Sequence, residues 1–128
     1  MIAHSFGGAS TVFTLANLDQ SIEIKRMVMV ACPSDFQDML SQFLEALNAP
    51  QGVAKRFGKI VSSVVKIPIA EANVGQLLPK AKIEDLLVVH DRHDEVVPFA
   101  QGELIASTVS HSLLLISQGW GHFALMIN

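Results

Sequence analysis

The sequence predicts a single α/β domain built on a parallel sheet of about three strands with flanking helices. Three short apolar runs, at 26–31, 86–89 and 112–117, are typical of strands buried on both faces. Helical patterns alternate with these runs, and such an alternation implies parallel pairing with right-handed crossovers. Half of the residues are hydrophobic and the mean hydropathy is +0.40. This composition indicates a sheet covered on both faces, or an apolar surface that contacts a partner.

The first expected element is a helix from Gly7 to about Asn17. Its apolar residues recur at helical spacing: Ala9, Val12, Phe13 and Ala16. A turn is expected at Leu18–Ser21. The apolar run Arg26–Ala31 follows as a strand, which Pro33 ends.

Two helices are expected between the first two apolar runs. Ser34 and Gln37 form a capping-box pattern, in which the serine caps the helix start. The helix that follows ends at Asn48–Pro50 and carries one apolar stripe: Phe36, Met39, Leu40, Phe43, Leu44 and Leu47. A second helix is expected over Val53–Val65, weakened by Gly58.

The second half of the chain continues the alternation. Pro68 closes the preceding helix, and a short helix is expected at Glu71–Leu78. The strand Leu86–Val89 ends at a polar cluster, and Pro98 suits the first position of a helix that continues to about Ser107. A strand at 112–117, a turn at Gly119–Gly121 and the beginning of a last helix complete the prediction.

Composition and charge narrow the classes of function. A net charge of −3 and a pI near 5.9 give no electrostatic case for nucleic-acid binding. No stretch approaches the ~20 apolar residues of a membrane span, and the N-terminus lacks the pattern of a signal peptide. The single cysteine, Cys32, excludes an internal disulfide and fits a reducing compartment. We therefore expect a cytoplasmic protein that binds no membrane and needs no cofactor.

The segment Ala3-His4-Ser5-Phe6-Gly7-Gly8 indicates a nucleophile elbow, a sharp strand-to-helix turn that exposes a serine. Small neighbours are needed because the backbone passes close by, although Ala3 stands where a glycine is usual. The N–H of Phe6, at the start of the next helix, can bind an oxyanion. The alternative is a glycine-rich helix start in which Ser5 is a simple N-cap.

The polar run His90-Asp91-Arg92-His93-Asp94 follows the second apolar strand. A metal site is the weaker interpretation, since no third cluster supplies the remaining ligands. The favoured interpretation is an acid loop, in which Asp94 orients a histidine and stabilises its imidazolium. Asp91 and Glu95 would then be structural.

Gly119-Trp120-Gly121-His122 places a histidine in a tight turn after the third strand. The glycines would let this loop approach the serine, which makes His122 the candidate general base. The alternative is a turn histidine without a role. His4, His90, His93 and His111 have weaker claims as the base.

Taken together, these segments resemble the α/β-hydrolase superfamily, in which the triad follows the order serine, acid, histidine. Asp94 follows Ser5 by 89 residues and His122 follows Asp94 by 28, which suits that family. The form His-Asp-x-x-Asp-x-x-Val-Pro at 90–98 is similar to bacterial esterase-type members. The resemblance implies that Ser5 is the nucleophile, Asp94 the acid and His122 the base. It also implies that residues 34–80 are a helical lid over the substrate pocket.

The resemblance covers only the C-terminal part of the family fold. Members have several strands before the elbow, and an early loop donates a second oxyanion N–H. We therefore expect residues 1–128 to form one truncated domain with impaired activity. An apolar sheet edge should be exposed, and it favours a homo-oligomer.

Three functions follow from these observations. The first is a serine hydrolase that cleaves an ester or similar acyl compound, with an uncharged acyl group suggested by the mostly apolar segment 36–79. The second is a non-catalytic hydrolase remnant that acts as an oligomeric structural or binding protein. A haloalkane dehalogenase or epoxide hydrolase relative is disfavoured, because those enzymes place a carboxylate where Ser5 stands.

Overall fold

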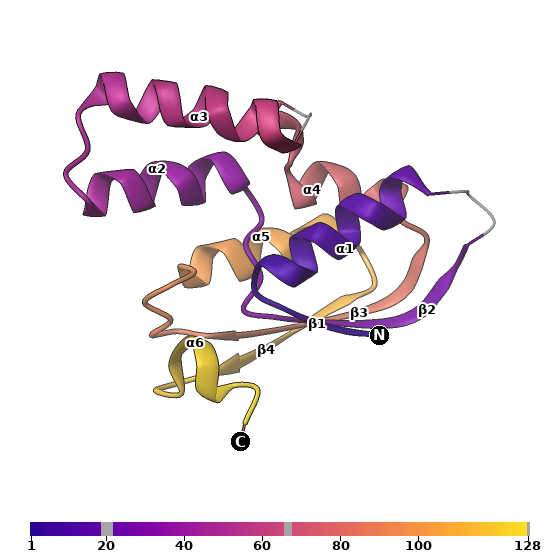
Figure 1. The fold of residues 1–128 in the computed structure, drawn as a ribbon. Coiled ribbons are helices and arrows are strands. Elements are labelled where there is room, and N and C mark those ends of the chain that lie inside the picture. The colour runs from indigo at the N-terminus through magenta and orange to yellow at the C-terminus, as the bar shows by residue number, and fades with distance from the viewer. Residues whose placement is uncertain (19–21, 66–67, 128) are drawn as a thin grey trace.

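The computed structural model describes residues 1–18, 22–65 and 68–127, which form four parallel strands with helices packed against them (Figure 1). The strands are β1 (Ile2–His4), β2 (Ile24–Val30), β3 (Ile83–Asp91) and β4 (Ser112–Ser117), in the spatial order β1-β2-β3-β4. The helices are α1 (Phe6–Asn17), α2 (Phe36–Ala46), α3 (Gln51–Val65), α4 (Val74–Leu77), α5 (Phe99–Thr108) and α6 (Gly121–Ala124). Two 3₁₀ turns, η1 (Ile69–Glu71) and η2 (Leu78–Lys80), flank α4. The predicted α/β class is confirmed, with β1 as a strand beyond the three expected.

Several local predictions need correction. The N-cap of α2 is Asp35 rather than Ser34, because the Asp35 carboxylate accepts the N–H groups of Gln37 and Asp38 at 2.8 and 3.1 Å. The single helix expected at Glu71–Leu78 is divided into η1, α4 and η2, since the Asn73 side chain caps α4 separately. The turn expected at Leu18–Ser21 falls mostly outside the described residues.

The two faces of the sheet differ in their cover. Ala3, Met29, Val88 and Leu114 are neighbours in the strand register, and they pack into the hydrophobic core beneath α1, α4 and α5. The next row of the register points to the opposite face and contains Ile2, Val28, Leu87 and Leu113. On that face Figure 1 shows only α6 and the end of the chain. Ile2 and Leu113 are accordingly 68% and 72% exposed.

Helices α2 and α3 form a hairpin that stands away from the sheet (Figure 1). Its two ends meet in a short neck, where Val74 N–H donates to the Ser34 carbonyl at 2.7 Å and Asp35 pairs with Asn73. The buried Gln101 of α5 fastens this neck, since its Oε1 accepts the N–H groups of Ser34 and Asp35 at 2.8 and 3.0 Å. Gln101 Nε2 also donates to Asp38 Oδ2 of α2 at 2.7 Å, so this residue of α5 ties the beginning of the hairpin to the sheet domain.

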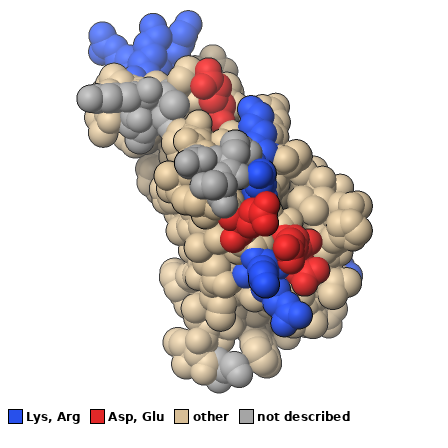
Figure 2. Space-filling model, turned by 90° about the vertical axis from the view of Figure 1, so that its right-hand side faces the viewer, with Lys and Arg blue, Asp and Glu red and all other residues tan. Residues whose placement is uncertain are grey.

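Charges of both signs are interleaved along the side of the molecule shown in Figure 2. Arg26 lies 3.5 Å from Asp85, and Lys82 lies 3.9 Å from Glu23. Such a surface has no extended field of one sign. Within the described residues, every helix is too short or too polar to cross a bilayer.

Candidate active site

Ser5 occupies a strained turn between β1 and α1. Its φ of 53° and ψ of −136° are unfavourable for a residue with a Cβ atom, and such strain concentrates at functional sites. The turn is held by the Ser5 N–H, which donates to the Val30 carbonyl of β2 at 2.9 Å. Ser5 stands at the N-cap position of α1, but its side chain makes no capping hydrogen bond to the helix.

The small residue that this turn requires is Gly8 rather than Gly7. A Cβ atom at Gly7 would meet open space, whereas one at Gly8 would collide with the Cys32 thiol. Gly8 therefore lets α1 approach the end of β2 closely. Cys32 is fully buried at this contact, and its burial raises the pKa of the thiol to about 12.

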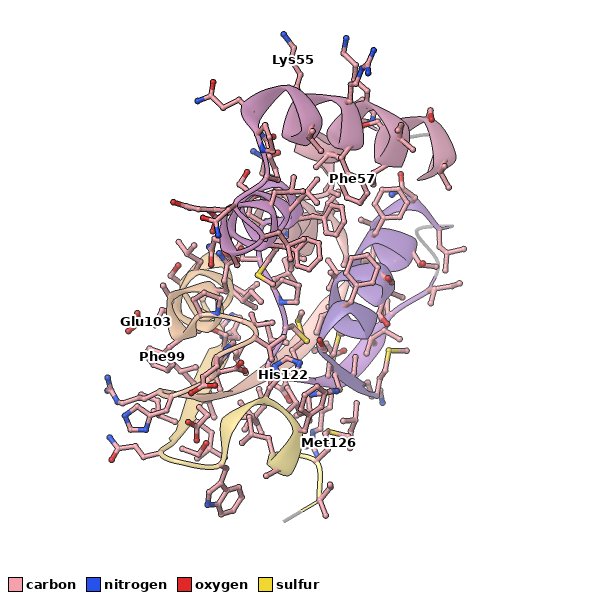
Figure 3. The ribbon with its side chains drawn as sticks, turned by 60° about the vertical axis from the view of Figure 1, so that its left-hand side comes forward. Lys55, Phe57, Phe99, Glu103, His122 and Met126 are labelled. Atoms are coloured by element: carbon pink, nitrogen blue, oxygen red, sulfur yellow. The ribbon has the colours of Figure 1, made fainter. Side chains whose placement is uncertain are left out.

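The structure brings Ser5, His122 and Asp94 together. His122 Nε2 lies 2.9 Å from Ser5 Oγ, and His122 Nδ1 lies 2.8 Å from Asp94 Oδ2. Because a carboxylate only accepts, Nδ1 carries the proton and Nε2 is left to accept one from the serine hydroxyl. His122 and Asp94 are 5% and 8% exposed, which shields both contacts from water. Figure 3 shows His122 on the side of α6 that faces the body of the protein.

Asp94 is fixed by the backbone of its own loop. Its Oδ1 atom accepts the N–H groups of Val96 and Val97, each at 2.8 Å. Oδ2 is therefore left to face His122. The loop sequence thereby sets which oxygen of the acid is presented to the base.

Phe6 begins α1, where the helix itself supplies no acceptor for the N–H group. The N–H of Phe6 also stands at the positive end of the helix dipole, which favours a developing negative charge. Its ring is 54% exposed and lies against Phe36, with 5.2 Å between the ring centroids. The predicted oxyanion donor is thus adjacent to Ser5 and to the neck of the α2–α3 hairpin.

Asp91 holds the loop that carries His122. Its carboxylate accepts the Ser117 hydroxyl at 2.7 Å and the N–H groups of Gly119 and Trp120 at 3.2 and 3.0 Å. It also accepts the His93 N–H at 2.8 Å. Burial, the largest influence, raises the pKa of Asp91, but these hydrogen bonds, that from Ser117 foremost, outweigh burial and hold the pKa well below its usual range. Asp91 is structural, as the sequence predicted.

Two further histidines, which had weaker claims as the base in the sequence, lie beside the three predicted residues. His4 Nε2 lies 3.1 Å from the His122 carbonyl, and the two rings are 4.9 Å apart. His90 is fully buried, with Nε2 3.6 Å from Asp94 Oδ2. For His90 a signal was present in the sequence, because it continues the alternation of Leu86 and Val88 toward the buried helical face.

The residues of the polar run at 90–94 do not converge as metal ligands. His93 is exposed, whereas His90 is buried against Asp94 and the Phe99 ring. Among the described residues, no group of three His, Cys, Asp or Glu side chains is arranged to hold an ion.

A cavity of about 240 Å³ begins at Phe6 and runs along α1. Its walls are almost entirely apolar and carry no charged side chain: Phe6, Ala9, Ser10, Phe13, Thr14, Phe36, Ala72, Val74 and Leu77. The Thr14 hydroxyl is occupied by a 2.8 Å hydrogen bond to the Ser10 carbonyl. The cavity therefore suits an uncharged apolar group.

Comparison with solved structures identifies the fold. The esterase domain of a Rhodothermus marinus protein superposes with a TM-score of 0.63 and 14% identity, over 94% of this chain and 49% of that one. An Exiguobacterium antarcticum esterase superposes with a TM-score of 0.62 and 17% identity, over 98% of this chain and 60% of that one. A puromycin-hydrolyzing peptidase from Mycobacterium tuberculosis superposes with a TM-score of 0.64 and 20% identity, over 94% of this chain and 18% of that one. The described residues form part of an α/β-hydrolase fold, and the chain spans 18–60% of the length of these three structures.

Comparison by sequence adds no closer relative. No family model matches the chain, and no curated protein matches it either.

Proposed function

We propose that the protein is a serine hydrolase that cleaves an ester or similar acyl compound. The observation that carries the proposal is the continuous chain of contacts from Ser5 Oγ through His122 to Asp94, at 2.9 and 2.8 Å. Three segments far apart in the sequence contribute these groups. The strain at Ser5 and the burial of Asp94 support the same interpretation.

In the proposed reaction, Ser5 Oγ attacks the acyl carbon while His122 Nε2 takes the hydroxyl proton. Asp94 keeps the imidazole in the productive tautomer and stabilises the imidazolium, and the Phe6 N–H stabilises the oxyanion. The bond to the leaving group then breaks, and the leaving alcohol takes the proton from His122. A water molecule, deprotonated by His122, attacks the acyl-serine, which releases the acid and restores Ser5.

We expect the 128 residues on their own to turn over slowly. Phe6 supplies one backbone donor to the oxyanion, whereas members of the family that the sequence resembles use a second N–H group from an early loop. Loss of a single oxyanion donor lowers kcat by about 10²–10³ in serine hydrolases. The proposed lid, residues 34–80, includes the α2–α3 hairpin, whose neck borders the apolar cavity at Phe36 and Ala72. That cavity supports an uncharged acyl group as the part of the substrate that is bound. The single cysteine favours a reducing compartment, and we propose the cytoplasm.

A fluorophosphonate probe tests the proposed nucleophile. We expect mass spectrometry to find slow, stoichiometric labelling of Ser5 in the folded chain. Labelling should be lost in Ser5→Ala and reduced at least 100-fold in His122→Ala. Thr11→Ser, on the same helix but outside the wall of the apolar cavity, is the matched control and should label as the wild type does. If Ser5 is labelled no faster in the folded chain than in urea, the hydrolase proposal is wrong.

Turnover of p-nitrophenyl esters of increasing acyl length tests the substrate class and the expected slow rate. Acetate to hexanoate should show falling KM, because the longer chains can enter the cavity of about 240 Å³. Ala9→Phe, which narrows the cavity, should remove that preference. Turnover at the rate of an efficient esterase would contradict the expected impairment.

The second candidate function is that of a non-catalytic oligomer. It is favoured by the open sheet face, where Leu113 and Leu115 are 72% and 56% exposed and Ile2 of the edge strand β1 is 68% exposed. We propose a homo-oligomer that covers this face and the free edge of β1. Light scattering of the purified chain should give at least twice the monomer mass. Leu113→Lys should return it to a monomer, and a stable wild-type monomer would contradict this candidate.

A further inference from the structure

His90 is a buried imidazole directly behind the acid of the proposed site. Its side chain is fully buried at the carboxyl end of β3. The Phe99 ring meets it edge-on, with 6.0 Å between centroids, and Figure 3 shows Phe99 at the start of α5. One turn further along α5, a Cβ atom at Gly102 would stand 2.5 Å from His90 Nδ1. The ring is therefore confined between β3 and α5.

The hydrogen bonds of the ring assign its tautomer. His90 Nε2 lies 2.9 Å from the Val97 carbonyl, which can only accept, so Nε2 carries the proton. His90 Nδ1 is buried and has no hydrogen-bond partner among the described residues. A second proton there would be a buried N–H with no acceptor, pressed against Gly102. In the neutral ring the proton is therefore on Nε2.

This N–H group is directed at the loop that fixes Asp94. Val97 is held at both ends, because its carbonyl accepts from His90 and its N–H donates to Asp94 Oδ1 at 2.8 Å. His90 Nε2 is also 3.6 Å from Asp94 Oδ2, the oxygen that accepts from His122. At 3.6 Å this second contact is electrostatic rather than a hydrogen bond. The Nε2–H group of His90 thus faces the Asp94 carboxylate, but it does not replace His122 as the hydrogen-bond donor to Oδ2.

We propose that His90 is a positioning residue that, as a neutral Nε2–H donor, holds Val97 and thereby aims Asp94 Oδ2 at His122. The inference rests on the proposed hydrolase function for its kinetic consequence. A protonated ring would instead form an ion pair with Asp94 and compete with the imidazolium of His122. Displacement of a catalytic group by about 1 Å can lower a rate about 100-fold, so loss of the donor should slow acylation.

Two substitutions separate the hydrogen bond from the packing. His90→Phe keeps a ring in the same space but cannot donate to Val97, and His90→Gln restores an N–H group. We expect His90→Phe to fold and to react with the fluorophosphonate 10–100-fold more slowly. His90→Gln should recover most of the rate, and His93→Gln, in the exposed part of the same loop, should match the wild type. A His90→Phe rate within twofold of the wild type would overturn the inference.

Long-range ¹H–¹⁵N spectra test the same inference without any catalysis. They should show His90 protonated only at Nε2 at neutral pH, and a low-field His122 Nδ1–H signal that moves upfield in His90→Phe. An Nδ1–H or doubly protonated His90, or an unmoved His122 signal, would also overturn it. If the wild-type chain does not react with the probe, the hydrolase proposal fails on its own, while these spectra still decide the role of His90.

Discussion

Replacing Asp91 by asparagine should destabilise the protein and displace the proposed base. The carboxylate accepts four hydrogen bonds, three of them from Ser117 at the end of β4 and from Gly119 and Trp120 of the β4–α6 loop. An asparagine has one acceptor oxygen, so its NH₂ group must take the place of the other. The less damaging orientation puts NH₂ at Oδ2, where the Ser117 hydroxyl can turn to accept. The Trp120 N–H is then left without an acceptor.

The size of the effect follows from these contacts. The part-buried Trp120 N–H without an acceptor costs about 1–3 kcal/mol at most, and the remaining hydrogen bonds lose the strengthening that a charged acceptor gives. Relief from burying a charge offsets part of this loss, which leaves about 3 kcal/mol of destabilisation. For a chain of this length, that corresponds to a fall in Tm of about 10 °C. Movement of the loop should also slow labelling of Ser5 by the fluorophosphonate.

The pH dependence gives a second signature. The folded state lowers the pKa of Asp91, so the unfolded chain, with an aspartate pKa of about 3.9, binds the proton more readily. The contribution of Asp91 to stability is therefore complete above about pH 5 and is lost as the pH falls below about 4. Asp91→Asn removes this contribution. The Tm difference between wild type and variant should thus be largest at pH 7 and shrink toward pH 3.

Calorimetry at pH 7, 5 and 3 measures both effects. Asp85→Asn is the matched control on the same strand, because Asp85 is exposed and makes a surface ion pair with Arg26 at 3.5 Å. Such a pair contributes about 0–1 kcal/mol, so the control should move Tm by a few degrees at most. If Asp91→Asn lowers Tm no more than Asp85→Asn does, the anchoring role assigned to Asp91 is wrong.

Three further substitutions test the elbow and its surroundings. Ser5→Gly should unfold about 1 kcal/mol less readily than Ser5→Ala in urea titrations, because glycine accepts a φ of 53° without strain; equal values would argue against a strained turn. Gly8→Ala should lower the free energy of unfolding by about 1–3 kcal/mol, because the added methyl group overlaps the Cys32 thiol. Adding Cys32→Ala should restore part of this stability, and strictly additive losses in the double variant would rule out that contact. His4→Phe, which cannot donate to the His122 carbonyl, should slow labelling of Ser5 several-fold, with recovery in His4→Gln; an unchanged rate would show that the 3.1 Å contact has no kinetic part.

The strands were predictable to the extent that each forms an apolar run of its own. The runs at 26–31, 86–89 and 112–117 became β2, β3 and β4. The expected burial on both faces is wrong for β4, where Leu113 and Leu115 are exposed, because helices cover one face of the sheet there. Strand β1 has only Ile2, Ala3 and His4, too few residues for a period to emerge. Its pairing with β2 is set by register, Ile2 beside Val28, which is a long-range property. Asp35 rather than Ser34 is the N-cap because its carboxylate accepts the N–H groups of Gln37 and Asp38, and residue type alone does not decide between two neighbouring cap formers.

The three residues of the candidate site could be proposed from the sequence, but the contacts that hold them in place could not. Residue type and order singled out Ser5, Asp94 and His122, because nucleophile, acid and base need those chemistries. The position of His4 depends on its contact with His122, which is 118 residues away in the sequence. The position of His90 depends on its packing against Gly102 of α5. No local pattern encodes such contacts.

The end of β3 explains why both partners of Ser5 are held in place. Strand alternation puts His90 on the helix-covered face, with Leu86 and Val88, and Asp91 on the opposite face beside the β4–α6 loop. His90 contacts the acid loop from one side, and Asp91 holds the loop of the base from the other. Ser5 is tied to the same place, since its N–H bonds Val30 and the next residue, Ala31, donates to Val89 at 2.9 Å. A shift of β3 by one residue would exchange the two faces, so the geometry of the proposed triad depends on the β2–β3 register as much as on its own three side chains.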